Sequence, residues 1–142
     1  MVRYLVFMIA FLAQTVAFAQ DPIEGLWYNE EKTAKIRIYK AKNDKFYGKI
    51  DWLKEPVKDG KERTDEKNPD KDKRNETLLG LVVLKGFEKS SKDEYEDGTI
   101  YDPKNGKTYS CIITHKGDKL DVRGYVGFSW IGRTAVWTRV PE

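Results

Sequence analysis

Side chains that could carry out chemistry are few in this sequence. His115 is its only histidine and Cys111 its only cysteine. A Ser-His-Asp or Cys-His arrangement would have to use His115, yet a histidine followed by Lys116-Gly117 is typical of a solvated turn. One His and one Cys do not supply the usual ligand set of zinc. We therefore expect no catalytic residue, no metal site and no cofactor.

Carboxylates are the remaining candidates for chemistry. Segment 65–72 could offer oxygen ligands to calcium, but it lacks the glycine and the terminal Glu of a helix-loop-helix calcium site. Lys67 and Lys71 also lie within it, and Lys73 and Arg74 follow directly. Asp102 precedes Pro103, which favours a role in forming a turn. An enzyme with carboxylates clustered around a cavity is the least favoured hypothesis. The aspartates that could pair in space are Asp51, Asp65, Asp70, Asp72, Asp97 and Asp102.

Alternating apolar and polar residues predict the strands that would position these side chains. In residues 33–40, Ile36 and Ile38 alternate with charged residues, and in residues 45–53 Phe46, Ile50 and Trp52 share one expected face. No apolar period of 3.6 residues runs long enough for a substantial helix. The sequence therefore predicts an all-β, eight-stranded, antiparallel up-and-down barrel. Its strands are expected near residues 24–28, 33–40, 45–53, 78–87, 99–101, 107–114, 119–126 and 133–140.

The first and last of these strands are expected to pair and close the barrel. Gly25 would let a neighbouring group approach closely, and Trp27 is large enough to fill one end. An arginine of the last strand, Arg139 in preference to Arg133, could stack on the indole. We expect a closure group of Gly25, Trp27, Arg133, Trp137 and Arg139.

Residues 1–19 are typical of a signal peptide cleaved after Ala19. Arg3 provides the positive start, an apolar run follows, and Ala17-Phe18-Ala19 matches a cleavage site. The run is shorter than the ~20 residues of a membrane span. Residues 20–142 are expected to form a single domain, periplasmic or secreted, without a stable membrane span after cleavage. The net charge of +3 comes from interspersed signs, which does not favour a nucleic-acid partner.

Two loops could contact a partner. Residues 54–77 have no apolar period, carry many charges of both signs and include Pro56 and Pro69. Such a loop is either solvated or functional. The second loop, Phe128-Ser129-Trp130, places two large rings close together, and exposed rings of this kind mark an interaction site.

Several motifs resemble the bacterial secreted DUF2147 family over the whole mature chain. They are Gly-x-Trp at 25–27, residues 48–53, Asp65 with Asn68-Pro69-Asp70, residues 79–81, residues 98–109, residues 120–127 and residues 132–139. Gly-x-Trp on the first strand with an arginine on the last also resembles the lipocalin-like (calycin) barrels. The resemblance implies one lipocalin-like barrel and no particular activity. The 54–77 loop is richer in Lys and Asp than the resemblance leads us to expect.

These observations favour an exported, non-enzymatic binding protein whose barrel accepts a small apolar or amphipathic molecule. Arg123 and Arg133 could orient a carboxylate or phosphate. The alternative is a cell-envelope interaction module that uses the 54–77 loop and the Phe128-Trp130 loop. The ligand contacts expected from the first hypothesis are Ile36, Ile38, Phe46, Ile50, Leu84, Tyr101, Tyr109, Ile112, Leu120, Val122, Arg123 and Val136.

Overall fold

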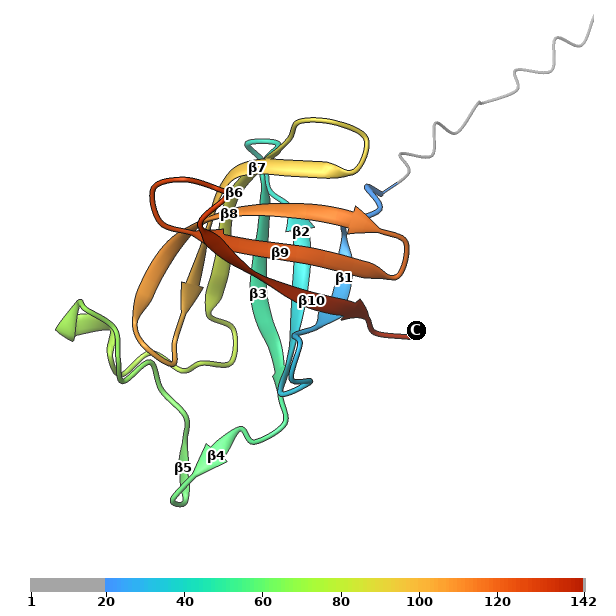
Figure 1. Cartoon of the computed structure of the whole chain (residues 1–142). Coiled ribbons are helices and arrows are strands. Elements are labelled where there is room, and N and C mark those ends of the chain that lie inside the picture. Colours follow the sequence, from blue (N-terminus) through green and yellow to red (C-terminus); the bar gives the residue numbers. More distant parts are fainter. Residues whose placement is uncertain (1–19, 142) are drawn as a thin grey trace, which may run out of the picture.

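A computed structural model describes residues 20–141, and the expected signal peptide at 1–19 lies outside the described residues. Eight strands form a closed antiparallel barrel in the order β1-β10-β9-β8-β7-β6-β3-β2, with a small β4-β5 hairpin beside it (Figure 1). The expected eight-stranded, all-β barrel is thereby confirmed. The elements are β1 (Gly25–Tyr28), β2 (Ala34–Lys40), β3 (Phe46–Leu53), β4 (Val57–Lys58), β5 (Lys61–Glu62), a 3₁₀ turn (Lys71–Lys73), β6 (Val82–Lys89), β7 (Glu94–Asp102), β8 (Lys107–Lys116), β9 (Lys119–Tyr125) and β10 (Gly132–Arg139).

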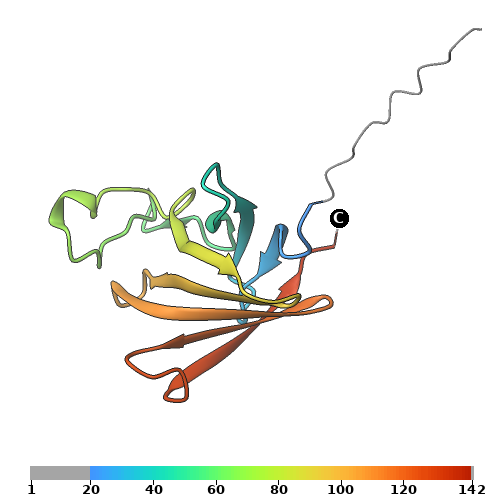
Figure 2. The same ribbon diagram turned by 90° about the horizontal axis from the view of Figure 1, so that it is seen from above.

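Each barrel strand pairs with its neighbours in the chain, and β1 pairs with β10 to close the sheet. We call the two ends of the barrel the tryptophan end and the loop end. The tryptophan end holds Trp27 and the turns at 41–45, 90–93 and 117–118. The loop end holds the turns at 29–33 and 103–106, segment 54–81 and loop 126–131. In Figure 2 the long 54–77 loop and loop 126–131 both extend toward the left.

Inward-facing side chains fill the middle of the barrel and its tryptophan end. Ile36, Ile38 and Ile50 are nearly inaccessible, and Leu84 and Leu120 are fully buried. Apolar side chains that alternate along half-solvated strands pack into one continuous core of this kind. Residues near the loop end, such as Ile100 and Ala135, are only partly buried. The core therefore occupies the middle of the barrel and its tryptophan end.

The tryptophan end is closed by Trp27 and Arg139. The Trp27 indole is fully buried and donates a hydrogen bond from Nε1 to the Ile23 carbonyl at 2.8 Å. Gly25 has a φ of +120°, and a β-carbon there would lie 2.8 Å from Nη1 of Arg139. Arg133 instead lies in solvent, 3.9 Å from a Glu30 carboxylate oxygen. Arg139, not Arg133, is thus the arginine that lies against the indole.

A bulge turns Trp52 outward. Ile36 pairs with Ile50 while Lys35 pairs with Trp52, so Asp51 is an extra residue on β3 and the register shifts there. An extra residue reverses the side-chain alternation beyond it. Trp52 consequently packs edge-to-face against Tyr28 outside the barrel, with the Lys35 ammonium 4.8 Å from its ring centroid. The expected inward face of Trp52 is wrong for this reason.

A second irregularity explains why β7 is longer than the expected strand at 99–101. Asp97 has a positive φ, and the β7–β8 register shifts between Tyr95 and Gly98. Tyr95 and Gly98 are both buried although they stand three positions apart. The bulge interrupts the alternation, so the sequence does not reveal the first half of β7.

The long loop at 54–77 is fastened to the barrel by Asp65. This carboxylate is fully buried and accepts hydrogen bonds from the Tyr101 hydroxyl at 2.7 Å and the Asn68 amide at 2.8 Å. The Lys67 carbonyl lies so close to Gly106 that a β-carbon there would be 1.9 Å from its oxygen. The loop therefore packs on the β7–β8 turn while most of its charged side chains remain in solvent.

Candidate functional site

The most exposed apolar side chains of the described residues lie in loop 126–131, which we call the aromatic loop. Val126 is 73% exposed, Phe128 58%, Trp130 72% and Ile131 63%. The Phe128 and Trp130 rings stack on one another with centroids 4.5 Å apart and planes 18° apart. Adjacent apolar side chains exposed in this way mark a contact surface on a folded protein.

Local hydrogen bonds hold the aromatic loop in place. The Phe128 N–H donates to the Val126 carbonyl at 3.1 Å, and the Ile131 N–H donates to the Phe128 carbonyl at 3.0 Å. Arg123 on β9 donates from Nε to the Ser129 carbonyl at 2.7 Å. The two residues therefore project from a turn held by hydrogen bonds, and each leaves more than half of its surface exposed.

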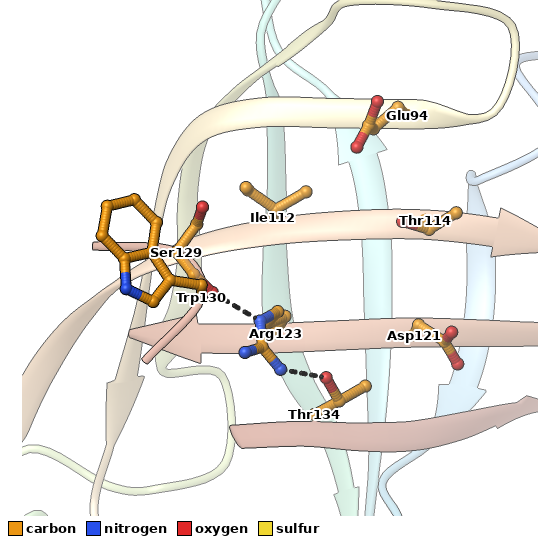
Figure 3. Close-up of a pocket in the computed structure, with 8 residues that line it drawn as sticks. All are labelled: Glu94, Ile112, Thr114, Asp121, Arg123, Ser129, Trp130 and Thr134. Carbon is orange, nitrogen blue, oxygen red and sulfur yellow. Dashed lines mark hydrogen bonds between the residues drawn. The ribbon is translucent and has the colours of Figure 1, made fainter. Parts of the chain in front are cut away.

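Beside the aromatic loop the outer face of the sheet is hollowed (Figure 3). This outer hollow has a volume of about 290 Å³ and extends across β7, β8, β9 and β10. The Trp130 indole forms one wall, and Arg123 donates from Nη1 to Thr134 Oγ1 at 2.9 Å across the floor. Its lining residues are Glu94, Ile112, Thr114, Asp121, Arg123, Ser129, Trp130 and Thr134.

The outer hollow offers hydrogen-bonding groups of both charges beside an aromatic wall. The Asp121 carboxylate pairs with the Lys116 ammonium at 2.6 Å. The Arg123 guanidinium is oriented by its bonds to Ser129 and Thr134. Polar groups fixed in this way can orient a bound group, while the apolar rings supply contact area.

Most ligand residues expected inside the barrel are core residues. Ile36, Ile38, Phe46, Ile50, Leu84, Leu120 and Val122 are buried and pack against one another. Tyr109 lies closer to the loop end, where its hydroxyl accepts a hydrogen bond from the Asn105 amide at 3.0 Å. Any contact of these residues with a ligand remains a prediction.

The expected interior positions of Ile112 and Val136 are wrong. On β8 the fully buried side chains are Cys111 and Ile113, so Ile112 lies on the outer face and lines the outer hollow. On β10 Trp137 is buried, so its neighbour Val136 faces outward and is 37% exposed. The segments around Ile112 and Val136 are apolar on both faces, so they contain no alternation that shows which residues face inward.

Tyr101 and Arg123 also lie outside the barrel interior. The Tyr101 hydroxyl binds Asp65 of the long loop, and Arg123 lies on the outer face between β10 and the aromatic loop. Tyr95 is a buried core residue that the sequence pattern does not predict. The bulge at Asp97 and the early start of β7 conceal Tyr95, since no regular alternation precedes it.

Burial and hydrogen bonds shift the pKa values of two titratable groups near the core, Asp21 and Cys111. Burial raises the pKa of Asp21, but hydrogen bonds from Lys89, Tyr95 and the Ile23 N–H outweigh it, so the pKa lies below its ordinary value. Burial raises the pKa of the Cys111 thiol to about 12. His115 packs edge-to-face on Trp27 with ring centroids 6.2 Å apart. Within residues 20–141, no three His, Cys, Asp or Glu side chains are grouped to hold a metal.

These features define a lipocalin-like barrel whose first and last strands are fastened by a tryptophan and an arginine. The protein HP1028 from Helicobacter pylori, described as belonging to the lipocalin family, shares this fold. The two are 23% identical and superimpose with a TM-score of 0.74 over 87% of this chain and 86% of the other. The family described as uncharacterized protein conserved in bacteria (DUF2147) matches residues 25–139, and the chain belongs to that family. No curated protein matches the chain.

Proposed function

We infer that this is an exported, non-enzymatic binding protein of the bacterial envelope that acts through the aromatic loop and the outer hollow. The observation that carries the proposal is the exposure of Val126, Phe128, Trp130 and Ile131 within a single braced loop. Contiguous apolar surface of this kind is disfavoured in water and becomes favourable when a partner covers it.

The barrel interior gives less support to ligand binding. The expected small apolar or amphipathic ligand would have to displace side chains such as Leu84, Ile113 and Leu120, which have almost no accessible surface. Displacing well-packed core side chains is unfavourable because their dispersion contacts and their burial are both lost. We therefore place the binding surface on the outside of the barrel.

The apolar segment at residues 1–19 supports export to the periplasm or the medium. Within residues 20–141 no helix has the length and apolar character needed to cross a membrane. Cell fractionation and mass spectrometry of the recovered protein test the export part of the proposal. The expected product begins at Gln20.

Photo-crosslinking in the producing bacterium tests the binding surface. A benzoylphenylalanine residue is introduced at position 130 or, as a matched control, at exposed Lys42 in the turn at the tryptophan end. Illumination is expected to give discrete adducts from position 130 and none from position 42. Adducts that are absent at 130, or equal at both positions, would overturn the proposal.

A second measurement separates this surface from the barrel interior. Native mass spectrometry and tryptophan quenching against a panel of fatty acids are carried out on the wild type and on a Phe128→Ser/Trp130→Ser variant. We expect no stoichiometric complex that survives both substitutions. A fatty acid complex that is unchanged in the variant would return the binding site to the interior.

A further inference from the structure

The first half of β10 has an unpaired edge. β1 covers only four residues and β10 covers eight, so the β1–β10 ladder consists of Trp27 opposite Arg139 and Tyr28 opposite Thr138. In Figure 1 the first half of β10 extends past β1. Beyond the ladder, the Val136 N–H donates to the Glu30 carboxylate at 3.2 Å. The Glu30 side chain thus accepts the hydrogen bond that a further residue of β1 would otherwise accept.

The direction of the backbone groups along this edge follows from their neighbours. The Val140 N–H donates to the Leu26 carbonyl of β1, whereas the Arg139 N–H donates to the Asp118 carbonyl toward β9. Successive residues of a strand direct their N–H and C=O groups to opposite sides. The backbone groups of Gly132 and Thr134 therefore point away from β9, and within residues 20–141 no strand pairs with them there.

We propose that this edge, Gly132–Val136, binds an extended polypeptide segment by strand addition. Unpaired N–H and C=O groups in a row form a template for one more strand, and folded proteins use such edges to recognise peptides. The added strand gains main-chain hydrogen bonds from Thr134 and Gly132. This inference rests on the proposed binding function and specifies the class of partner.

The surfaces beside the edge fit the side chains of such a segment. Thr134 belongs both to the edge and to the lining of the outer hollow, so the hollow reaches the position of the added strand. Alternate side chains of an added strand would face outward, next to Thr134 and Val136. The aromatic loop leads directly into Gly132 and provides an apolar surface at one end of the edge. The segment favoured is one with alternating apolar residues.

A second copy of the chain fits this edge less well than a single peptide. In an antiparallel β10–β10 pair, the copy's own β1 and its turn at 29–33 would lie on the paired side, because β1 joins β10 along the same edge. The second copy's turn at 29–33 would then clash with the aromatic loop of the first copy. A linear peptide has no such attached structure.

Fluorescence anisotropy with a synthetic peptide tests the proposal. The probe is a labelled, acetylated peptide of about eight residues, a typical strand length, in which Val or Phe alternates with Thr, Ser or Lys. Two further peptides carry N-methyl groups on one or the other alternate set of residues. We expect one methylated peptide to bind at least about tenfold more weakly and the other to bind like the parent, because only one set faces β10. Absence of binding, or equal weakening by both sets, would overturn the proposal.

Protein variants provide the matching control. Thr134→Pro removes the outward N–H, and proline is tolerated on an edge strand whose N–H faces solvent. Thr134→Ala removes the same hydroxyl partner of Arg123 but keeps the N–H. Peptide binding should fall at least about tenfold in Thr134→Pro and remain in Thr134→Ala. Binding retained in a folded Thr134→Pro protein would contradict strand addition, and the N-methylated peptides decide the question if that variant does not fold.

Two further outcomes separate this inference from the function on which it rests. A stable dimer, detected by sedimentation and lost in Thr134→Pro, would assign the edge to self-association and overturn the peptide proposal. Cross-links from position 130 that persist in Thr134→Pro, together with no peptide binding, would leave the aromatic loop as a binding surface but reject strand addition.

Discussion

The guanidinium carbon of Arg139 lies 3.9 Å from the centroid of the Trp27 ring. Arg139 also donates from Nη1 to the Glu24 carbonyl at 2.8 Å and from Nη2 to the Pro22 carbonyl. One side chain of the last strand therefore covers the indole and binds the backbone that precedes the first strand. Because the β1–β10 ladder is short, this contact fastens the barrel where strand pairing is weakest.

Trp27→Ala should destabilise the protein strongly. The indole is fully buried, so its removal leaves a large cavity and an unpaired Ile23 carbonyl. The expected loss in the free energy of unfolding is about 3–5 kcal/mol. Urea titration measures it. A variant as stable as the wild type would show that the barrel does not depend on this ring.

Arg139→Lys should lower the free energy of unfolding by about 1 kcal/mol or more. Lysine keeps the charge but loses the planar stack and the paired donation to two carbonyls. Arg133→Lys is the matched control, since Arg133 is on the same strand with its side chain in solvent, and its effect should be near zero. Equal effects in the two urea titrations would contradict the assignment of Arg139.

Tyr101→Phe should loosen the long loop without unfolding the barrel. The substitution removes one hydrogen-bond donor from the buried Asp65 carboxylate. The free energy needed to open the loop should therefore fall by about 1–3 kcal/mol. Hydrogen exchange should accelerate at the amides of Asp65 and Leu78, which donate to Glu76 and Arg63 within the loop. Tyr47→Phe is the control, because among the described side chains the Tyr47 hydroxyl is hydrogen-bonded only to the exposed Asn43 amide. Unchanged exchange at both amides would mean that Asp65 does not hold the loop.

Cys111 should make the protein less stable in alkali. Its pKa is 9.0 before burial and about 12 in the folded protein, so ionisation above pH 9 favours the unfolded chain. Stability from this group is complete below pH 9 and is lost as the pH rises toward 12. The loss between pH 8 and 10 is about 1 kcal/mol.

Cys111→Ala removes the thiol and so isolates its contribution to the pH dependence of stability. The stability difference between wild type and variant should shrink by that amount between pH 8 and 10 in urea titrations. Burial and hydrogen bonds to aspartates also raise the pKa values of Tyr95 and Tyr101, and their contribution begins above pH 10. A difference that is constant from pH 8 to 10 would contradict the burial of the thiol.

The sequence by itself determined the barrel and its core face wherever apolar and polar residues alternate. Ile36, Ile38, Phe46 and Ile50 were predicted to share one face because a strand places every second side chain on the same side. They are buried together in the structure. Strand count and closure followed from the same pattern and from the turn residues between the strands.

The tertiary structure decided those features that no local sequence pattern indicates. Cys111-Ile112-Ile113 is apolar throughout, so only its pairing with β7 and β9 places Ile112 outside. Nothing in the local pattern around Asp65 indicates that its carboxylate is buried, because the burial depends on hydrogen bonds from the Tyr101 hydroxyl and the Asn68 amide. The free edge of β10 likewise arises because a four-residue strand closes against one of eight residues. Alternation is a property of a single strand. Which face of a strand points inward, whether a charge is buried and whether an edge stays unpaired all depend on the elements that pack beside that strand.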